Sequence, residues 1–384
     1  MKGKNAILHN KYYNVLRLYL KISGIWPYHK LCDRCVRFVL VFTFCFGILI
    51  PQTLYLIGPI NLDDIFECVP SIIIGIIFST KILILMLNNK KIKICLNTIE
   101  KDWQSLNTDI EKVILQRHAK YGQYLTTFYA IFMFTTECLI LLKPTISILT
   151  RDNILNVTES DTPIMPDLPY HLEYGKRFNQ YVILITIHCF GAVFAHMFVT
   201  VAVDNLFYTL IQHACGMFSI IGYMLESIGK NADINFDSKL SKVKDENYNK
   251  ALYCLRKHIQ VIEFAQLIES VYTKIFLVNF NLNMLLGSLI GIQILMNLDK
   301  GISNVIGPAA IYIAQLTHLF LLFWQAQFLL DYSVLPYESI CRANWYFASE
   351  RCQKILLLIM KRTNSPCKTT AGKLVILSIE SFGA

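Results

Sequence analysis

The stretch YVILITIHCFGAVFAHMFVTVAV, residues 181–203, contains no Asp, Glu, Lys or Arg. About 20 predominantly apolar residues in a helix are enough to cross the hydrocarbon core of a bilayer, so this stretch predicts a membrane-spanning helix. Five more stretches of comparable length and largely apolar composition lie on either side of it, at residues 38–57, 66–87, 124–149, 272–296 and 306–330. Strands of a membrane barrel are about half as long, so the pattern predicts helices.

The composition of the whole chain agrees with this pattern. Hydrophobic residues make up 54% and charged residues 16% of the 384 residues, whereas a soluble domain typically has about 25% charged residues. The first 30 residues lack the apolar core and the cleavage site of a signal peptide. No internal repeat or low-complexity linker divides the chain, so we predict one all-α integral membrane domain over residues 1–384.

The last sixteen residues, 369–384, are mostly apolar, with one lysine and one glutamate. They predict the beginning of a seventh membrane span, but a complete span needs about 20 residues. We therefore expect a bundle of seven membrane helices whose seventh helix is incomplete in this sequence.

Positive charge predicts the orientation of the bundle, because cytoplasmic segments retain lysine and arginine. Of the 36 lysines and arginines, 28 lie before the first span or in residues 88–123, 204–271 and 331–368, and four lie in the loops on the opposite side. The N-terminus is therefore predicted to be cytoplasmic, which is inverted relative to G-protein-coupled receptors. Topology and anionic lipid account for the net charge of +9 without nucleic acid as a partner.

The predicted outer loops carry two further signs of this orientation. Asn156-Val157-Thr158 is an acceptor motif for N-glycosylation and falls in the loop at residues 150–180, so Asn156 is a predicted glycosylation site. None of the 12 cysteines lies in these loops, where an oxidising environment would favour disulfides.

Motifs for metal binding and catalysis are weak or missing in the sequence. Cys32 and Cys35 have the spacing of half a zinc site but no second pair, and His213 and Cys215 are two residues apart on a predicted helix, where they point to different sides. The sequence has no zinc-protease, nucleophile-elbow, phosphate-loop or dinucleotide motif. We therefore expect no metal, no cofactor and no enzymatic activity. A transporter is disfavoured because prolines do not recur at corresponding positions of the two halves.

Three segments of the chain resemble the insect odorant receptor family. Residues 16–27, LRLYLKISGIWP, are similar to its amphipathic start and Gly-x-Trp-Pro signature. The continuation of the fourth span resembles the family at Asp204-Asn205-Leu206, His213, Cys215-Gly216 and Phe218. The last part resembles it at Trp345, residues 353–360, Pro366, Ala371-Gly372-Lys373, Ser378 and Phe382. Cys341 departs from the pattern, because the family often has a tyrosine four residues before this tryptophan.

The resemblance implies an odorant-specific subunit of a ligand-gated, non-selective cation channel in the plasma membrane of sensory neurons. Four subunits, including an obligate odorant co-receptor, would surround one pore. Residues 204–271 and 331–368 would form a cytoplasmic anchor where subunits meet, with Trp345, Leu357 and Leu358. The seventh span would line the pore with Leu374, Ile376, Ser378 and Ser381. A chain that stops inside this span is expected not to conduct on its own.

A pocket for volatile molecules needs apolar and aromatic walls with a few polar groups. The third, fourth and fifth spans offer such side chains, and the candidate ligand-binding residues are Tyr129, Phe132, Phe134, His188, Phe190, Phe194, His196 and Asn279. The alternative for each is packing against neighbouring helices or lipid.

Charged residues inside the predicted spans are further candidates, because burying a charge in lipid is costly. Lys81 and Lys143 lie near the ends of their spans, where a lysine can snorkel to the interface. Glu137 is deeper and would either face a water-filled vestibule or form an interhelical hydrogen bond as a neutral acid. A gustatory receptor with the same fold but another ligand class, another chemosensory channel subunit, or a non-conducting truncated product remains the alternative function.

Overall fold

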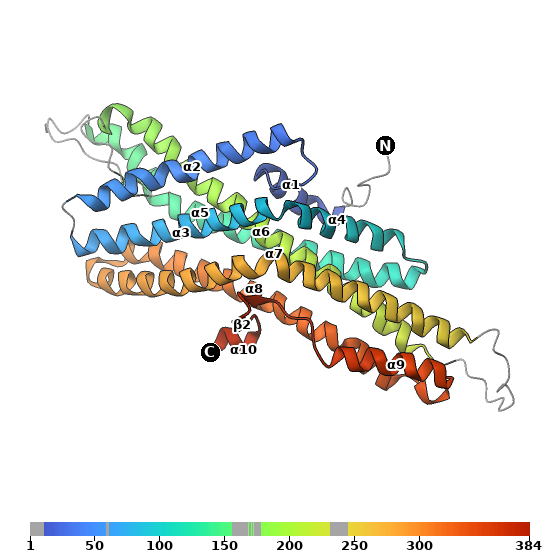
Figure 1. Ribbon diagram of the computed structural model, residues 1–384. Helices are drawn as coiled ribbons and strands as arrows, with labels where there is room; N and C mark the ends of the chain where they lie inside the picture. The colour runs from blue at the N-terminus through green and yellow to red at the C-terminus, as the bar shows by residue number, and fades with distance from the viewer. Residues whose placement is uncertain are drawn as a thin grey trace.

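Long helices dominate the computed structural model of this chain, which describes residues 11–58, 61–155, 168, 170, 172, 178–230 and 245–384 (Figure 1). Six of the helices in this part are long and apolar enough to cross a membrane. They are α2 (Leu31–Ile57), α3 (Leu62–Leu87), α5 (Asp109–Leu155), α6 (Phe178–Glu226), α7 (Glu246–Asn297) and α8 (Ile302–Arg342). Each contains one of the six stretches predicted from the sequence, so the prediction of an all-α membrane bundle is confirmed.

Shorter elements precede, connect and follow these helices. Before and between them lie the 3-10 turn η2 (Lys11–Tyr13), α1 (Asn14–Ile22), α4 (Asn89–Gln104) and the turn η4 (Leu298–Lys300). After α8 follow the turn η5 (Trp345–Phe347), α9 (Glu350–Thr363), the strands β1 (Thr370–Ala371) and β2 (Val375–Ile376), and α10 (Ile379–Gly383).

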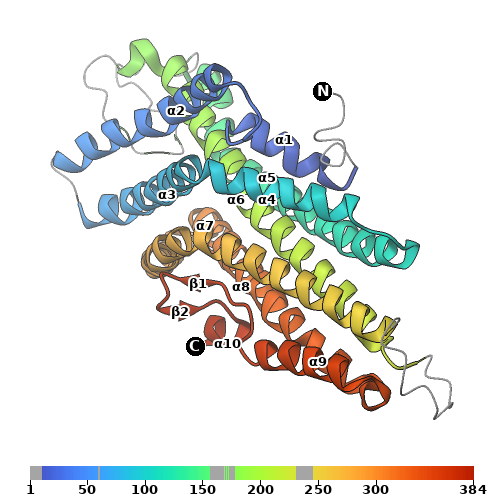
Figure 2. The ribbon, with the colours of Figure 1, turned by 45° about the vertical axis from the view of Figure 1, so that its right-hand side comes forward.

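Helix α6 is the centre of the bundle. It packs against α1, α2, α3, α5, α7 and α8, and Figures 1 and 2 show it running lengthwise between the other long helices. Nearly every residue from Val199 to Ile221 is buried. A helix that is apolar on all sides is stable only when neighbours surround it, and this explains why the charge-free stretch at residues 181–203 continues into a buried segment.

Four of the long helices continue well past their apolar stretches. The extensions of α5, α6, α7 and α8 pack together at the end of the molecule where α9 also lies (Figure 1). Asp245 caps the start of α7, because its side chain accepts a hydrogen bond of 2.9 Å from the backbone N–H of Tyr248. Ser349 caps α9 in the same way through the N–H of Cys352.

The chain after α9 differs from the sequence prediction of a helix that begins at residue 369. β1 and β2 pair antiparallel, with Thr370 opposite Ile376 and Ala371 opposite Val375. The backbone becomes helical only in α10, where Ser378 accepts a hydrogen bond of 3.1 Å from the N–H of Ser381. The prediction of continuous helix over residues 369–384 is therefore wrong for the first part of this stretch.

The turn between the two strands explains this correction. Gly372 and Lys373 both have positive φ, +62° and +64°, which a right-handed helix excludes. The turn is held on α7, because the backbone N–H of Gly372 donates to the carbonyl oxygen of Thr273 at 2.9 Å. The N–H of Thr370 donates to Oε2 of Glu269, also at 2.9 Å. These contacts with α7 replace the intrahelical hydrogen bonds that a continuous helix would make.

Replacing Gly372 with alanine should lower the stability of the protein by about 1–2 kcal/mol, the cost of a left-handed conformation for a residue with a side chain. The new Cβ would also lie 2.8 Å from side-chain atoms of Leu277 on α7. The measurement is the unfolding temperature of the purified protein in detergent. Gly383→Ala is the matched control, because no atom lies within 4 Å of a Cβ added there, and equal stability of the two variants would contradict the turn described above.

Candidate functional site

A cavity of about 940 Å³ lies among α3, α5, α6, α7 and α8. Most of its wall is apolar, with Ile74, Ile77, Phe78, Met133, Ile140, Val193, Met197, Leu286, Ile290, Ile311 and Ala314. A smaller polar set includes Ser71, Lys81, Thr136, Glu137, Ser147, Tyr170, His196, Thr200, Asn283, Gln293, Asn297, Asn304, Gln315 and His318. Ligand pockets typically enclose about 300–1,000 Å³ with mainly apolar walls and few polar groups, so the cavity has the size and composition of a small-molecule site.

Helical spacing turns one row of side chains on each helix toward the cavity. On α3 the row is Ile74, Ile77, Phe78 and Lys81. On α8 the row is Ile311, Gln315 and His318. Residues three and four apart share one face of a helix. Each row ends in a basic side chain, and the two ends meet, because Nζ of Lys81 lies 3.2 Å from Nε2 of His318.

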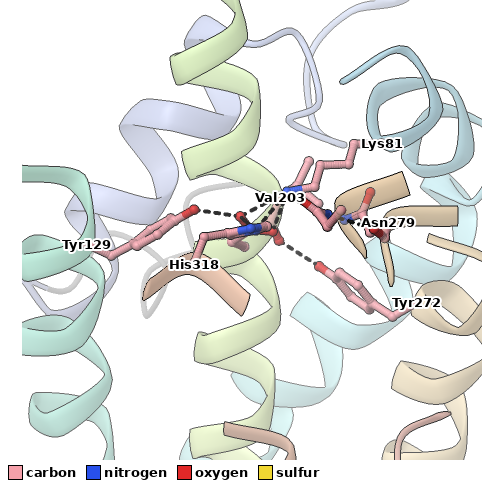
Figure 3. A network of polar contacts seen from close by, with 8 residues as sticks. Lys81, Tyr129, Val203, Tyr272, Asn279 and His318 are labelled. Carbon is pink, nitrogen blue, oxygen red and sulfur yellow. Dashed lines mark hydrogen bonds and ion pairs between the residues drawn. The ribbon is translucent and has the colours of Figure 1, made fainter. Parts of the chain in front are cut away.

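Lys81, Tyr129, Asp204 and His318 form a buried ion cluster at this end of the cavity (Figure 3). Nζ of Lys81 lies 3.0 Å from each carboxylate oxygen of Asp204. Oδ2 of Asp204 also accepts a hydrogen bond of 2.8 Å from the hydroxyl of Tyr129 and lies 2.9 Å from Nε2 of His318. One positive and one negative charge thus cancel inside the bundle, which is the condition under which charges are tolerated there.

The ion cluster connects most of the helices around the cavity. Its members come from α3, α5, α6 and α8, and a neighbouring contact adds α7, because the hydroxyl of Tyr272 donates to the carbonyl oxygen of Val203 at 3.0 Å (Figure 3). Tyr208 packs edge-on against Tyr129, with ring centroids 5.5 Å apart. The end of the cavity is therefore closed by polar contacts that fix five helices relative to one another.

Prolines lie inside three of the helices where they line the cavity. They are Pro70 in α3, Pro144 in α5 and Pro308 in α8. A proline has no N–H, so it cannot donate to the carbonyl group four residues before it. In α5 this carbonyl belongs to Ile140, which also lines the cavity.

Two of the predicted ligand residues lie at or beside the cavity. His196 lines it, with Nδ1 3.4 Å from the hydroxyl of Tyr170 and its ring edge-on to Phe78 at 4.7 Å. Tyr129 is fully buried, but it belongs to the ion cluster and is outside the lining of the cavity. Asn279, also buried, does not line the cavity either, although Asn283 one turn further along α7 does.

The other predicted aromatic residues pack elsewhere. Phe134 is largely exposed and lies 6.4 Å from Phe194 between ring centroids, and Phe132 stacks on Phe128 at 6.3 Å. The ring of His188 lies 5.9 Å from that of Phe44 on α2. Phe190 packs against a separate apolar cluster of Ile48, Ile185, Cys189 and Ala192. The structure brings neither these four residues nor Phe194 into the cavity.

Sequence reasoning missed most of the polar groups of the cavity. Lys81 was expected to snorkel to the membrane interface, but its side chain is 0% exposed and pairs with Asp204. The sequence did contain a feature that predicts this pair. A lysine inside one apolar helix and an aspartate at the end of another form a neutral pair when they meet. No sequence motif marked Gln315 and His318 as site residues. Only the structure shows that they lie in the same row on α8 and face the cavity. Glu137 lines the cavity, which agrees with a carboxyl group facing an internal space.

The residues assigned to the anchor and the pore lie outside the cavity. Trp345, Leu357 and Leu358 are exposed, and the last two are on α9. Leu374 in the turn is 80% exposed and Ile376 in β2 is also exposed, while Ser378 and Ser381 are at the start of α10. Asn156, the predicted glycosylation site, lies outside the described residues.

Potential metal ligands do not gather into a site within the described ranges of the chain, where no group of three or more His, Cys, Asp or Glu could hold a metal ion. Nε2 of His213 instead lies 3.0 Å from Oδ2 of Asp102 on α4. Cys215 is buried, and Cys32 and Cys35 are exposed with free thiols.

Comparison with known sequences finds a family match over most of the chain. The model of the family described as 7tm Odorant receptor matches residues 61–384. Odorant receptor 13a of Drosophila melanogaster is 23% identical over 197 residues, which are 48% of this chain and 45% of that protein. Odorant receptor Or2 of Anopheles gambiae is 25% identical over 130 residues, 34% of each chain. The aligned part of this chain thus spans less than half the length of these curated relatives.

Solved structures with the same fold include the insect olfactory receptor OR5 from Machilis hrabei. Its complex with eugenol superposes with a TM-score of 0.69 at 15% sequence identity, over 96% of this chain and 92% of that chain. A second structure of OR5 gives a TM-score of 0.70 at 14% identity, over 99% and 95% of the two chains. At such low identity the likeness establishes the fold.

Replacing Lys81 with methionine should destabilise the protein strongly, by about 3–5 kcal/mol, because it leaves the buried carboxylate of Asp204 without its counter-charge. The double variant Lys81→Met/Asp204→Asn should be more stable than Lys81→Met, since it removes both charges. The unfolding temperature in detergent measures both effects. In the control Lys354→Met, which breaks an exposed pair with Glu350 on α9, the change should stay within about 1 kcal/mol. A small loss for Lys81→Met would show that the cluster contributes little.

Proposed function

Because this chain belongs to the 7tm odorant receptor family, we propose that it is an odorant-specific receptor subunit that binds a volatile small molecule in the cavity between α3, α5, α6, α7 and α8. The observation that carries the proposal is the cavity itself, about 940 Å³ of mostly apolar space lined by five of the six long helices. A volatile molecule is small and predominantly apolar, so its transfer from water into such a space is favourable.

The position of the ion cluster supports a role of the cavity in signalling. A ligand in the cavity touches α3, α5, α6, α7 and α8, and the cluster joins the same helices at one end. A ligand changes a conformational equilibrium when it binds one arrangement of its surroundings better than another. We assign the cluster as the fixed end of the cavity. Ligand binding would then move the parts of the helices that line the cavity away from the cluster.

The signal proposed for the subunit is a non-selective cation current through a pore shared with an obligate odorant co-receptor, in a tetramer at the plasma membrane. Exposed apolar residues support subunit contacts at the anchor, since Trp345, Leu357 and Leu358 have no partner in a single chain that covers them. In the proposed channel, Leu374, Ile376, Ser378 and Ser381 contribute to the pore side. The exposed apolar side chain of Leu374 is compatible with burial in such an assembly.

A gustatory receptor subunit is the alternative function, because it would have the same fold and a similar cavity. A panel of volatile and non-volatile compounds separates the two. The odorant assignment expects current only with volatile compounds and only in the presence of the odorant co-receptor.

Filling the cavity should block the response to odorants. In Ala314→Phe, the larger side chain would occupy space next to Gln315 and Ile311, so the half-maximal odorant concentration should rise at least about tenfold, the ratio that corresponds to 1.4 kcal/mol of binding free energy. The measurement is current in cells that express the full-length subunit with the co-receptor.

The matched control is Ile313→Phe, one residue earlier on α8. Ile313 is 59% exposed and faces away from the cavity, whereas Ala314 is 9% exposed and lines it. The control should respond like the parent protein. Equal responses of both variants would place odorant binding outside the cavity.

The proposed orientation puts the N-terminus in the cytoplasm and the loop with Asn156 outside the cell. Asn156 should therefore carry an N-linked glycan, and treatment with a glycosidase should shift the mobility of the protein on a gel. The variant Asn156→Gln should not shift. A chain that reaches the cell surface without any glycan at this residue would count against the orientation.

A further inference from the structure

The polar groups of the cavity select a class of ligand, and this inference rests on the proposed function. We propose that the preferred ligand is a volatile amine with an apolar body, whose nitrogen donates hydrogen bonds to the carboxylate of Glu137. Some charged and polar groups facing the cavity already have partners in the protein, and others remain available to a ligand.

Lys81, the lysine of the cavity, is already paired and is not available to an acidic ligand. Nζ of Lys81 has three close neighbours, the two carboxylate oxygens of Asp204 at 3.0 Å and Nε2 of His318 at 3.2 Å. Both carboxylate oxygens of Asp204 thus accept from Lys81, and the third donor of the ammonium group faces the ring nitrogen of His318. The charge of Lys81 is cancelled by Asp204, and a carboxylate ligand would have to break this pair.

Glu137 is in the opposite situation. Its side chain lines the cavity on α5, and no hydrogen bond or ion pair from the described residues reaches it. It is eight residues after Tyr129, a distance of about 12 Å along the helix at 1.5 Å per residue. Glu137 is thus about two helical turns away from the ion cluster. Its carboxyl group takes no part in the cluster and has no basic partner within the described part of the chain.

Two further polar side chains lining the cavity are buried and incompletely paired. Gln315, 8% exposed, donates from Nε2 to the carbonyl oxygen of Asn283, so its Oε1 is an acceptor without a partner. His196, also 8% exposed, has no partner at Nε2. Leaving such groups unpaired in a buried site is costly, and both point to a ligand that forms hydrogen bonds in the cavity.

An amine fits this set better than the other classes of small volatile molecule. An ammonium group has up to three donors and a positive charge, which matches the Glu137 carboxylate and the Oε1 acceptor of Gln315. A ketone, ester or carboxylate has no N–H donor, and an alcohol has one donor and no charge. Ile140, Met133 and Ile74 supply apolar surface for the remainder of the ligand.

The test measures binding to the purified chain in detergent by calorimetry, with two matched pairs of probes: 2-phenylethylamine against 2-phenylethanol, and hexylamine against 1-hexanol. We expect each amine to bind at least about tenfold more tightly than its alcohol. In Glu137→Gln, which removes the charge but keeps the size of the side chain, this preference should disappear while alcohol binding stays the same. The control Glu263→Gln, at an exposed position on α7, should keep the preference.

A second measurement needs no variant at Glu137. N-acetylation of 2-phenylethylamine removes its charge and all but one donor, and the acetylated probe should bind the parent protein at least about tenfold more weakly than the free amine. Equal binding of amine and alcohol, or of amine and acetylated amine, would overturn the amine inference and leave the proposed function intact. If none of the probes binds, or if Ala314→Phe binds all of them like the parent protein, both the inference and the cavity as odorant site are wrong.

Discussion

The buried pair of Lys81 and Asp204 is the constraint on which the arrangement of the helices depends. Each charge alone would be costly inside the bundle, and each is satisfied only when α3 and α6 are in one register that brings Nζ to 3.0 Å from both carboxylate oxygens. Tyr129 and His318 then complete the shell of Asp204 from α5 and α8. The hydrophobic effect is non-directional, whereas the hydrogen bonds and the ion pair of this cluster depend on the relative position of four helices.

The same cluster borders the cavity through Lys81 and His318. The central helix α6 is buried at nearly every position from Val199 to Ile221, toward the end of the molecule where α9 packs. On the other side of the cluster, α3, α5 and α8 each contain a proline where they line the cavity. The molecule therefore combines a densely packed part and a part with a cavity, and the ion cluster lies between them.

The six long helices were predictable because the length of an apolar run reports directly on membrane crossing. The rotation of each helix about its axis was not predictable from the sequence. This rotation decides which aromatic residues reach the cavity. His196 lines it, whereas Phe194, two residues earlier on the same helix, packs with Phe134 instead. The hairpin of β1 and β2 was missed because apolar content is the same in a helix and a strand pair. The sequence feature that indicated a turn was Gly372, because glycine adopts the positive φ found here more readily than other residues. The contacts that hold the turn are with Glu269 and Thr273 on α7, which are far away in sequence.

The distribution of charge around the cavity separates the two tasks that a receptor of this kind must perform. A group that recognises a ligand must be unpaired in the empty site, because an already satisfied group gains nothing when the ligand arrives. A group that holds helices together must be paired at all times. Lys81 and Asp204 meet the second condition and Glu137 meets the first, although all three are ionisable residues within one helical bundle. Their separation along α3, α5 and α6 allows the ligand to change without any change in the contacts that define the fold.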